Sequence, residues 1–221
     1  MEKIESLKKQ EIQTTLSTLN LSYKILVVLK LILGLCLLPF VYSSSVSFLN
    51  EFTVIDKDLQ NYFWQGVITF LIFYLFIWQP NIIYLKGQRI LEIIFSFFRP
   101  FIKIAPYLLP IYTIILFFLY MVLSLLFSNQ YLINIFIFLF GFSIGLHLVF
   151  SARSIKAKQN DPLKTNYIFG FSLIYIINLG LLSFLFNFIF KDFSFVNFCN
   201  NSLQISRQMF NTIFQQLFLK K

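Results

Sequence analysis

Charged side chains are scarce in this chain. Of its 221 residues, 18 are Lys or Arg and 9 are Asp or Glu, so only 12% are charged while 58% are hydrophobic. The mean hydropathy is +0.77, whereas soluble domains carry about 25% charged residues. This composition excludes an ordinary soluble globular domain and predicts an integral membrane protein.

Metal-binding residues are also scarce: the chain has two cysteines, Cys36 and Cys199, and one histidine, His147. The cysteines form no C-x-x-C pair, so with a single histidine they cannot assemble a structural zinc site. We expect no cofactor.

The formal net charge of +9 could suggest a nucleic-acid partner. However, the basic residues lie at the ends of apolar segments, which favours membrane orientation and contact with anionic lipid heads, and not nucleic acid.

Long apolar segments are abundant. A helix needs about 20 residues to cross a hydrocarbon core of about 30 Å. Five segments reach this length, at 23–42, 62–84, 104–127, 131–151 and 166–190. We therefore predict an all-α, polytopic helical membrane protein. It would have a cytoplasmic N-terminal segment at 1–22, a five-span membrane domain at 23–190 and an external amphipathic tail at 191–221.

The charges between these segments predict an orientation, because cytoplasmic loops carry an excess of Lys and Arg. Basic residues gather before the first segment and in the second and fourth loops, at Lys3, Lys8, Lys9, Lys24, Lys86, Arg89, Arg99, Lys103, Arg153, Lys156, Lys158 and Lys164. The first loop is acidic instead. The N-terminus should thus be cytoplasmic and the C-terminus external. The bias toward Phe, Ile and Asn is typical of an AT-rich genome, which favours a bacterial inner membrane and leaves an organellar inner membrane open.

A short amphipathic helix is predicted at 87–99, between the second and third segments. At 100° per residue its polar side chains fall on one narrow stripe, and its Ile, Leu and Phe side chains cover the rest. The stripe consists of Gln88, Arg89, Glu92, Ser96 and Arg99. A helix this apolar should be embedded, and a buried Arg needs a carboxylate partner. We expect Glu92 to join Arg89 and Arg99 in an internal polar network.

A second amphipathic helix is predicted in the tail, at 202–219. One side carries Leu, Met, Ile and Phe, and the opposite side is rich in Gln and Asn. Such a helix should lie on the membrane or on a partner. Helices that bind lipid surfaces usually carry many Lys and Arg on the polar face, so the nearly uncharged face here favours packing against protein.

Four polar residues inside the apolar segments are candidates for function, namely Lys30, Asn134, His147 and Asn178. No Asp or Glu lies inside the five segments, so His147 has no acidic partner for a proton relay. A hydrogen-bonded structural role is favoured for it. Lys30 is either functional, as intramembrane charges often are, or reaches the nearby cytoplasmic surface with its ammonium group.

Small residues in the last two segments predict close helix contacts. Gly141 and Gly145 form a G-x-x-x-G, and Gly180 belongs to a comparable stripe in the fifth segment. Packing between helices of one monomer is the favoured interpretation. A homodimer face and a ligand path are the alternatives.

Several short stretches form a recognisable series along the chain. The first are Phe63-Trp64-Gln65-Gly66, Gln79-Pro80 with Tyr84-Leu85-Lys86-Gly87, and Ile104-Ala105-Pro106-Tyr107-Leu108-Leu109-Pro110-Ile111-Tyr112. His147-Leu148-Val149-Phe150, Asp161-Pro162 through Tyr167, and Phe171-Ser172-Leu173-Ile174-Tyr175 with Asn178 follow. Over roughly residues 25–190 this series resembles bacterial membrane proteins of the site-2-protease-like metallopeptidase family.

In that family a Gly-His-Glu-x-x-His motif begins the helix after the second span; the two histidines bind zinc and the glutamate activates its water. Here Gly87 matches the glycine, whereas Gln88, Arg89 and Glu92 occupy the positions of His, Glu and His. A fixed cation would stand where the general base should be. The resemblance therefore implies a degenerate member without the zinc ligands, and we expect no enzymatic activity.

The sequence thus favours a non-catalytic multi-pass membrane protein, a pseudoenzyme or scaffold that lies in the lipid bilayer and binds another membrane protein. An accessory structural subunit of a larger membrane complex, bacterial or organelle-encoded, is a second interpretation. A small transporter is a third, which the lack of intramembrane acids and of an internal repeat disfavours.

Overall fold

The computed structural model describes residues 2–77, 81–97, 104–127, 129–157 and 167–219, and every regular element in these ranges is a helix. In chain order these are α1 (Glu2–Phe52), α2 (Lys57–Ile72), the π-helix η1 (Phe73–Ile77), α3 (Asn81–Ile94), α5 (Ala105–Leu108), α6 (Ile111–Leu126), α7 (Gln130–Ala157), α8 (Tyr167–Ile189), α9 (Phe195–Phe214) and the π-helix η2 (Gln215–Leu219). The predicted all-helical class is confirmed.

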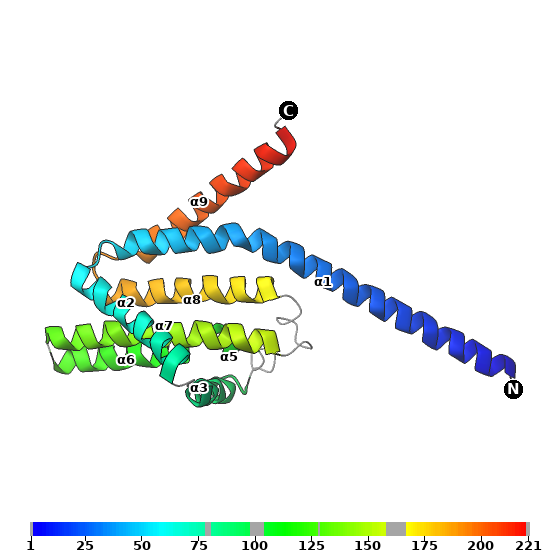
Figure 1. Ribbon diagram of the computed structural model, residues 1–221, viewed down its shortest axis with the longest axis horizontal. Coiled ribbons are helices and arrows are strands. Elements are labelled where there is room, and N and C mark those ends of the chain that lie inside the picture. Colours follow the sequence, from blue (N-terminus) through cyan, green and yellow to red (C-terminus); the bar gives the residue numbers. More distant parts are fainter. Residues whose placement is uncertain (1, 78–80, 98–103, 128, 158–166, 220–221) are drawn as a thin grey trace.

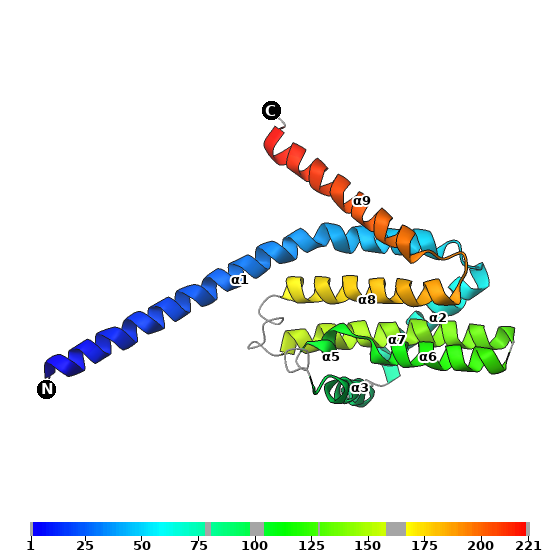
Figure 2. The same cartoon turned by 180° about the vertical axis from the view of Figure 1, so that it is seen from behind.

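The central part of the fold is a bundle of nearly parallel and antiparallel helices. In Figure 1, α6, α7, α8 and the C-terminal half of α1 run along one direction, and α2 crosses them at an angle. Contacts between α1 and α8, between α7 and both α6 and α8, and between α2 and α7 hold the bundle together. Seen from behind, α9 lies on the outer side of α1 and α3 lies on the opposite side of the molecule (Figure 2).

Three helices in the described part of the chain are long and apolar enough to cross a membrane. They are Val27–Phe52 within α1, Gln130–Ile155 within α7, and α8. A fourth span results if the pair Lys57–Phe76 and Asn81–Ile94 is counted as one broken span. The membrane class is thereby supported, whereas the predicted number of five spans is not confirmed.

Proline explains where two of the predicted spans are interrupted. The segment 62–84 is no single helix, because α3 is turned by 118° from the preceding helix. In the sequence, Pro80 lies between the two helices and outside the described residues, and a proline lacks the N–H that an uninterrupted helix requires. The segment 104–127 is split at Leu109, which is extended with ψ of 124° before Pro110. The remaining helix α6 has 16 residues, or about 24 Å, which is shorter than a typical hydrocarbon core.

The two ends of the chain also differ from the predicted division. The predicted boundary at 22–23 falls inside one helix, since α1 continues from Glu2 for 51 residues. In the tail, α9 begins at Phe195, seven residues before the predicted start at 202. Ser194 caps this helix, because its Oγ accepts a hydrogen bond from the Asn197 N–H at 3.2 Å.

A cluster of phenylalanines forms the core between α1, α2, α7 and α8. Phe48, Phe52, Phe63, Phe140 and Phe186 are its main buried members. Two glycines let α2 and α7 approach closely there. A Cβ added at Gly66 would lie 2.0 Å from the Phe138 carbonyl oxygen, and one at Gly141 would lie 2.1 Å from the Phe63 carbonyl oxygen.

Candidate functional site

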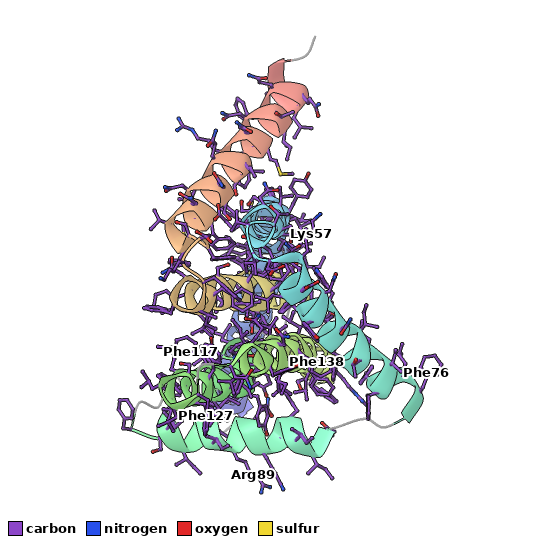
Figure 3. The ribbon with its side chains drawn as sticks, turned by 90° about the vertical axis from the view of Figure 1, so that its left-hand side faces the viewer. Lys57, Phe76, Arg89, Phe117, Phe127 and Phe138 are labelled. Carbon is purple, nitrogen blue, oxygen red and sulfur yellow. The ribbon has the colours of Figure 1, made fainter. Side chains whose placement is uncertain are left out.

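Helix α3, which contains Gly87, Gln88, Arg89 and Glu92, lies across the side of the bundle. Viewed along the bundle in Figure 3, α3 runs at a right angle to the helices that are seen end-on. Gly87 is buried against α6, where a Cβ would lie 2.8 Å from both the Ile111 Cγ2 and the Tyr112 Cε2 atoms. The Tyr112 hydroxyl also donates a hydrogen bond to the Ile83 carbonyl. Gly87 therefore allows the close contact that fixes α3 on the bundle.

A chain of hydrogen bonds begins on α3 and enters the bundle. The Gln88 amide nitrogen donates to the Tyr84 hydroxyl at 3.0 Å. The Tyr84 hydroxyl lies 3.1 Å from the Ser151 Oγ on α7. Ser151 in turn donates to the Tyr107 carbonyl at 3.3 Å. Tyr84 and Ser151 are buried and Gln88 is half-buried, so the chain links the surface of α3 to the interior.

His147 and Asn178 complete this polar cluster at the break between α5 and α6. The His147 Nε2 atom lies 3.1 Å from the Tyr107 carbonyl oxygen. The Asn178 amide nitrogen donates to the Leu108 carbonyl at 3.0 Å and to the Ile174 carbonyl at 2.8 Å. The chain leaves the helix at Leu109, so the Tyr107 and Leu108 carbonyls lose the helical partners they would otherwise have. The two side chains from α7 and α8 supply the missing donors, as a membrane interior requires.

The direction of these hydrogen bonds limits the chemistry of the cluster. A carbonyl oxygen can only accept, so the His147 Nε2 atom must carry the hydrogen toward Tyr107. The Ser151 Oγ atom, which donates to the same carbonyl, lies 3.3 Å from the His147 Nε2 atom. Because Nε2 carries a hydrogen in this arrangement, it cannot accept the Ser151 proton as a general base would. The cluster in this arrangement is suited to holding α3, α5, α7 and α8 together. No group of three or more His, Cys, Asp or Glu residues that could hold a metal occurs in the described part of the chain.

Among the described residues, the predicted polar stripe does not form an internal network. Arg89 and Glu92 are exposed on α3, Ser96 is exposed in the turn after it, and only Gln88 is turned toward the bundle. Figure 3 shows Arg89 on the side of α3 that faces away from the other helices. The physical reason is that Tyr84, Gly87 and Leu91 form the buried face of α3, which leaves Arg89 and Glu92 outside it. Arg99 lies outside the described residues.

The other predicted residues are distributed over the fold. Lys30 is half-buried on α1. Asn134 lies near the start of α7, where its Oδ1 accepts from the Gln130 amide at 3.5 Å. Gly145 lies against the Phe70 ring, at 3.0 Å from an added Cβ. An added Cβ at Gly180 meets no atom within 4 Å, so this glycine makes no close helix contact within the chain.

A small apolar pocket of about 200 Å³ lies between α1, α2, α7 and α8. Its walls include Phe48, Trp64, Ile144, Gly145, Leu148 and Leu179. At its edge the Ser45 and Tyr175 hydroxyls lie 2.9 Å apart. The pocket suits an apolar side chain or part of an acyl chain.

Sequence reasoning missed several polar residues that are buried in the structure. Ser151 follows His147 by four residues on the same helix, so its spacing could have indicated a shared face. Tyr84 gave no such signal, because its partner lies 67 positions away. Two serine pairs at i and i+4, Ser43 with Ser47 and Ser202 with Ser206, were also missed, although small residues at this spacing are typical of helix contacts in membranes.

Comparisons with protein-family models, with curated protein sequences and with solved structures find no match to this chain. The likeness to site-2-protease-like proteins thus rests on the short motifs alone and stays a hypothesis.

Proposed function

We propose that this chain is a non-catalytic multi-pass membrane protein, a pseudoenzyme or scaffold related to site-2-protease-like peptidases, that binds another membrane protein. The proposal depends chiefly on the side chains of α3. At the position of the first zinc-binding histidine, Gln88 donates its amide to Tyr84, and at the position of the general base stands the exposed cation Arg89. The helix is held on the bundle while its motif positions carry residues unsuited to zinc catalysis.

The lateral apolar pocket supports binding of a membrane segment. Its lining side chains are almost entirely apolar, and Trp64 and Leu49 at its rim are exposed. In a bilayer such a pocket would face lipid or the helix of another protein. We also propose the topology that the loop charges predict, with the N-terminus cytoplasmic and the end of α8 at Ile189 external, in a bacterial or organellar inner membrane.

Elemental analysis of the purified protein tests the catalytic part of the proposal. After purification without chelators we expect far less than one zinc per chain and no cleavage of membrane substrates. About one zinc per chain that is lost in Glu92→Ala would overturn the pseudoenzyme interpretation, because Glu92 is the one motif position able to ligate a metal.

Purification from native membranes tests the binding part. Under the proposal, other membrane proteins co-purify with the chain. A stable stoichiometric set of subunits would favour the alternative, an accessory subunit of a larger complex. The feature that favours this alternative is the polar outer face of α9. A chain that purifies alone, in mild detergent and after crosslinking, would contradict both interpretations.

A further inference from the structure

Helix α9 lies beside the membrane-spanning part of α1. The Ser194 N–H donates to the Glu51 carboxylate at 3.3 Å, and the Ser206 and Ser43 hydroxyls lie 2.6 Å apart. Further along, the Phe210 and Phe40 rings are in contact with centroids 5.7 Å apart. The partners on α1 run from 51 down to 40 as α9 advances, so the helices are antiparallel. The contact thus covers half of the candidate span Val27–Phe52.

Small side chains make this contact close. Ser43, Ser44 and Ser47 on α1 and Ser202 and Ser206 on α9 are all buried. Ser43 lies nine residues from Phe52, which is about 13 Å along a helix. If α1 crosses the membrane, Ser206 therefore lies well inside the hydrocarbon core.

The face of α9 opposite to α1 carries a regular stripe of polar residues. Asn200, Gln204, Arg207 and Asn211 are exposed and are spaced by four, three and four residues. At 100° per residue they point away from Phe198, Ser202 and Ser206, which are the buried residues of α9. The same spacing continues through Phe214 and Phe218. These six residues are here called the outer stripe, and their spacing places them on one side of the helix.

Lipid is an unsuitable neighbour for the outer stripe. Intramembrane Arg, Asn and Gln side chains usually face protein or water, because hydrocarbon offers them no hydrogen-bonding partner. Arg207 makes no hydrogen bond or ion pair within the described residues. All three views show α9 on the edge of the molecule, with no other helix over its outer side (Figures 1, 2 and 3).

We infer that the outer stripe of α9 binds a transmembrane helix of a partner protein, and that this helix carries a carboxylate opposite Arg207. The inference rests on the proposed scaffold function and names its contact surface. A second copy of this chain fits less well. Its outer stripe would bring another Arg207 and no carboxylate to the first outer stripe. The amides of Asn200, Gln204 and Asn211 would add hydrogen bonds between the helices.

A probe helix of known sequence tests the inference. The full chain, labelled with a donor fluorophore, is reconstituted in phosphatidylcholine vesicles with a Leu-rich transmembrane peptide that carries an acceptor and a single central Glu. A matched peptide has Gln instead. We expect the Glu peptide to associate about tenfold more tightly than the Gln peptide. Arg207→Gln should remove this preference, Arg207→Lys should keep part of it, and Arg89→Gln on the far side of the molecule should keep all of it.

The following outcomes would contradict the inference. Equal affinity for the two peptides, or equal losses in Arg207→Gln and Arg89→Gln, would mean that Arg207 does not select a carboxylate. Energy transfer between two labelled copies that depends on Arg207 would make the occupant a second copy. Co-purification from native membranes separates this inference from the proposed function. If partners stay bound to Arg207→Gln, the proposed scaffold function holds but the outer stripe is not its contact surface. If no partner co-purifies with the chain, the proposed scaffold function itself is wrong.

Discussion

At the scale of single residues, the polar side chains inside the bundle donate hydrogen bonds to backbone carbonyls. His147, Ser151 and Asn178 all donate to carbonyls, and two of these carbonyls lie next to each other where α5 ends. Tyr84 and Gln88 attach α3 to the same group. Because the break in the helix leaves backbone carbonyls without their helical partners, each donor supplies a hydrogen bond that these carbonyls would otherwise lack.

Replacing His147 tests this role. His147→Leu removes a donor to the Tyr107 carbonyl, and we expect the free energy of unfolding to fall by about 1–3 kcal/mol. His147→Gln places an amide nitrogen near the position of Nε2 and should recover much of that loss. Unfolding by sodium dodecyl sulfate in mixed micelles measures both variants. Equal losses in the two variants would show that packing of the ring matters and the hydrogen bond does not.

The exposed charges of α3 lead to the opposite expectation. Arg89 and Glu92 are both exposed, so Glu92→Gln, Arg89→Gln and the double variant should each change the free energy of unfolding by less than about 0.5 kcal/mol. The same titration measures them. A loss of several kcal/mol in Glu92→Gln that the double variant reverses would restore the internal network expected from sequence.

At the scale of elements, two helix contacts depend on small residues. The contact of α2 with α7 uses Gly66 and Gly141, where backbone meets backbone. The contact of α1 with α9 uses buried serines. In a membrane, helix association gains from such close packing because lipid provides no hydrophobic driving force between helices.

Alanine substitutions at two glycines form a matched test. Gly141→Ala would bring a methyl group to 2.1 Å from the Phe63 carbonyl oxygen. Since that oxygen belongs to the backbone of α2, the helices must separate, and we expect a loss of about 1–3 kcal/mol. Gly180→Ala meets open space and should gain up to about 1 kcal/mol from the better helix propensity of alanine. Similar effects at the two sites would contradict the close contact of α2 with α7.

A disulfide tests the position of α9. In a background with Cys36→Ser and Cys199→Ser, the pair Ser43→Cys and Ser206→Cys should crosslink on mild oxidation, because the two hydroxyls lie 2.6 Å apart. The control pair is Ser43→Cys with Arg207→Cys, which lies on the outer stripe and should stay reduced. The chain is cleaved by protease between α1 and α9, and its electrophoretic mobility is compared before and after oxidation. A shift in mobility indicates the crosslink. Crosslinking of both pairs alike would indicate that α9 does not keep a fixed face on α1.

At the scale of the whole molecule, the fold is a bundle of apolar helices with two amphipathic helices on opposite sides. On one side α3 lies across α6, and on the other α9 packs against α1 and rises obliquely from it (Figures 1 and 3). The bundle supplies the candidate spans, and both outer helices present exposed polar residues that a partner could contact.

Labelling of Cys199 tests the orientation of this bundle. In Cys36→Ser, we expect a membrane-impermeant maleimide to label Cys199 in intact cells, because α9 begins just after the end of α8 that we propose to be external. Burial raises the pKa of the Cys199 thiol. The reactive thiolate is therefore a small fraction at pH 7, and the labelling rate should rise by about tenfold per pH unit above it. Labelling that requires opened membranes, with a reporter fused before Met1 found outside, would reverse the orientation.

The sequence by itself determined the membrane class, the all-helical fold and the presence of two amphipathic helices, because composition and the 3.6-residue period depend only on neighbouring residues. The bounds of the first were wrong, since α3 spans Asn81–Ile94 and not 87–99. It also located His147 and Asn178 as unusual polar residues. Their partners are the Tyr107 and Leu108 carbonyls, which lie 40 and 70 positions away. Only the tertiary structure decided that contact, the exposure of Arg89 and Glu92, and the position of α9 on α1. The hydrophobicity of a segment indicates how much of a helix is buried away from water. It does not indicate which side of that helix contacts lipid and which side contacts another helix.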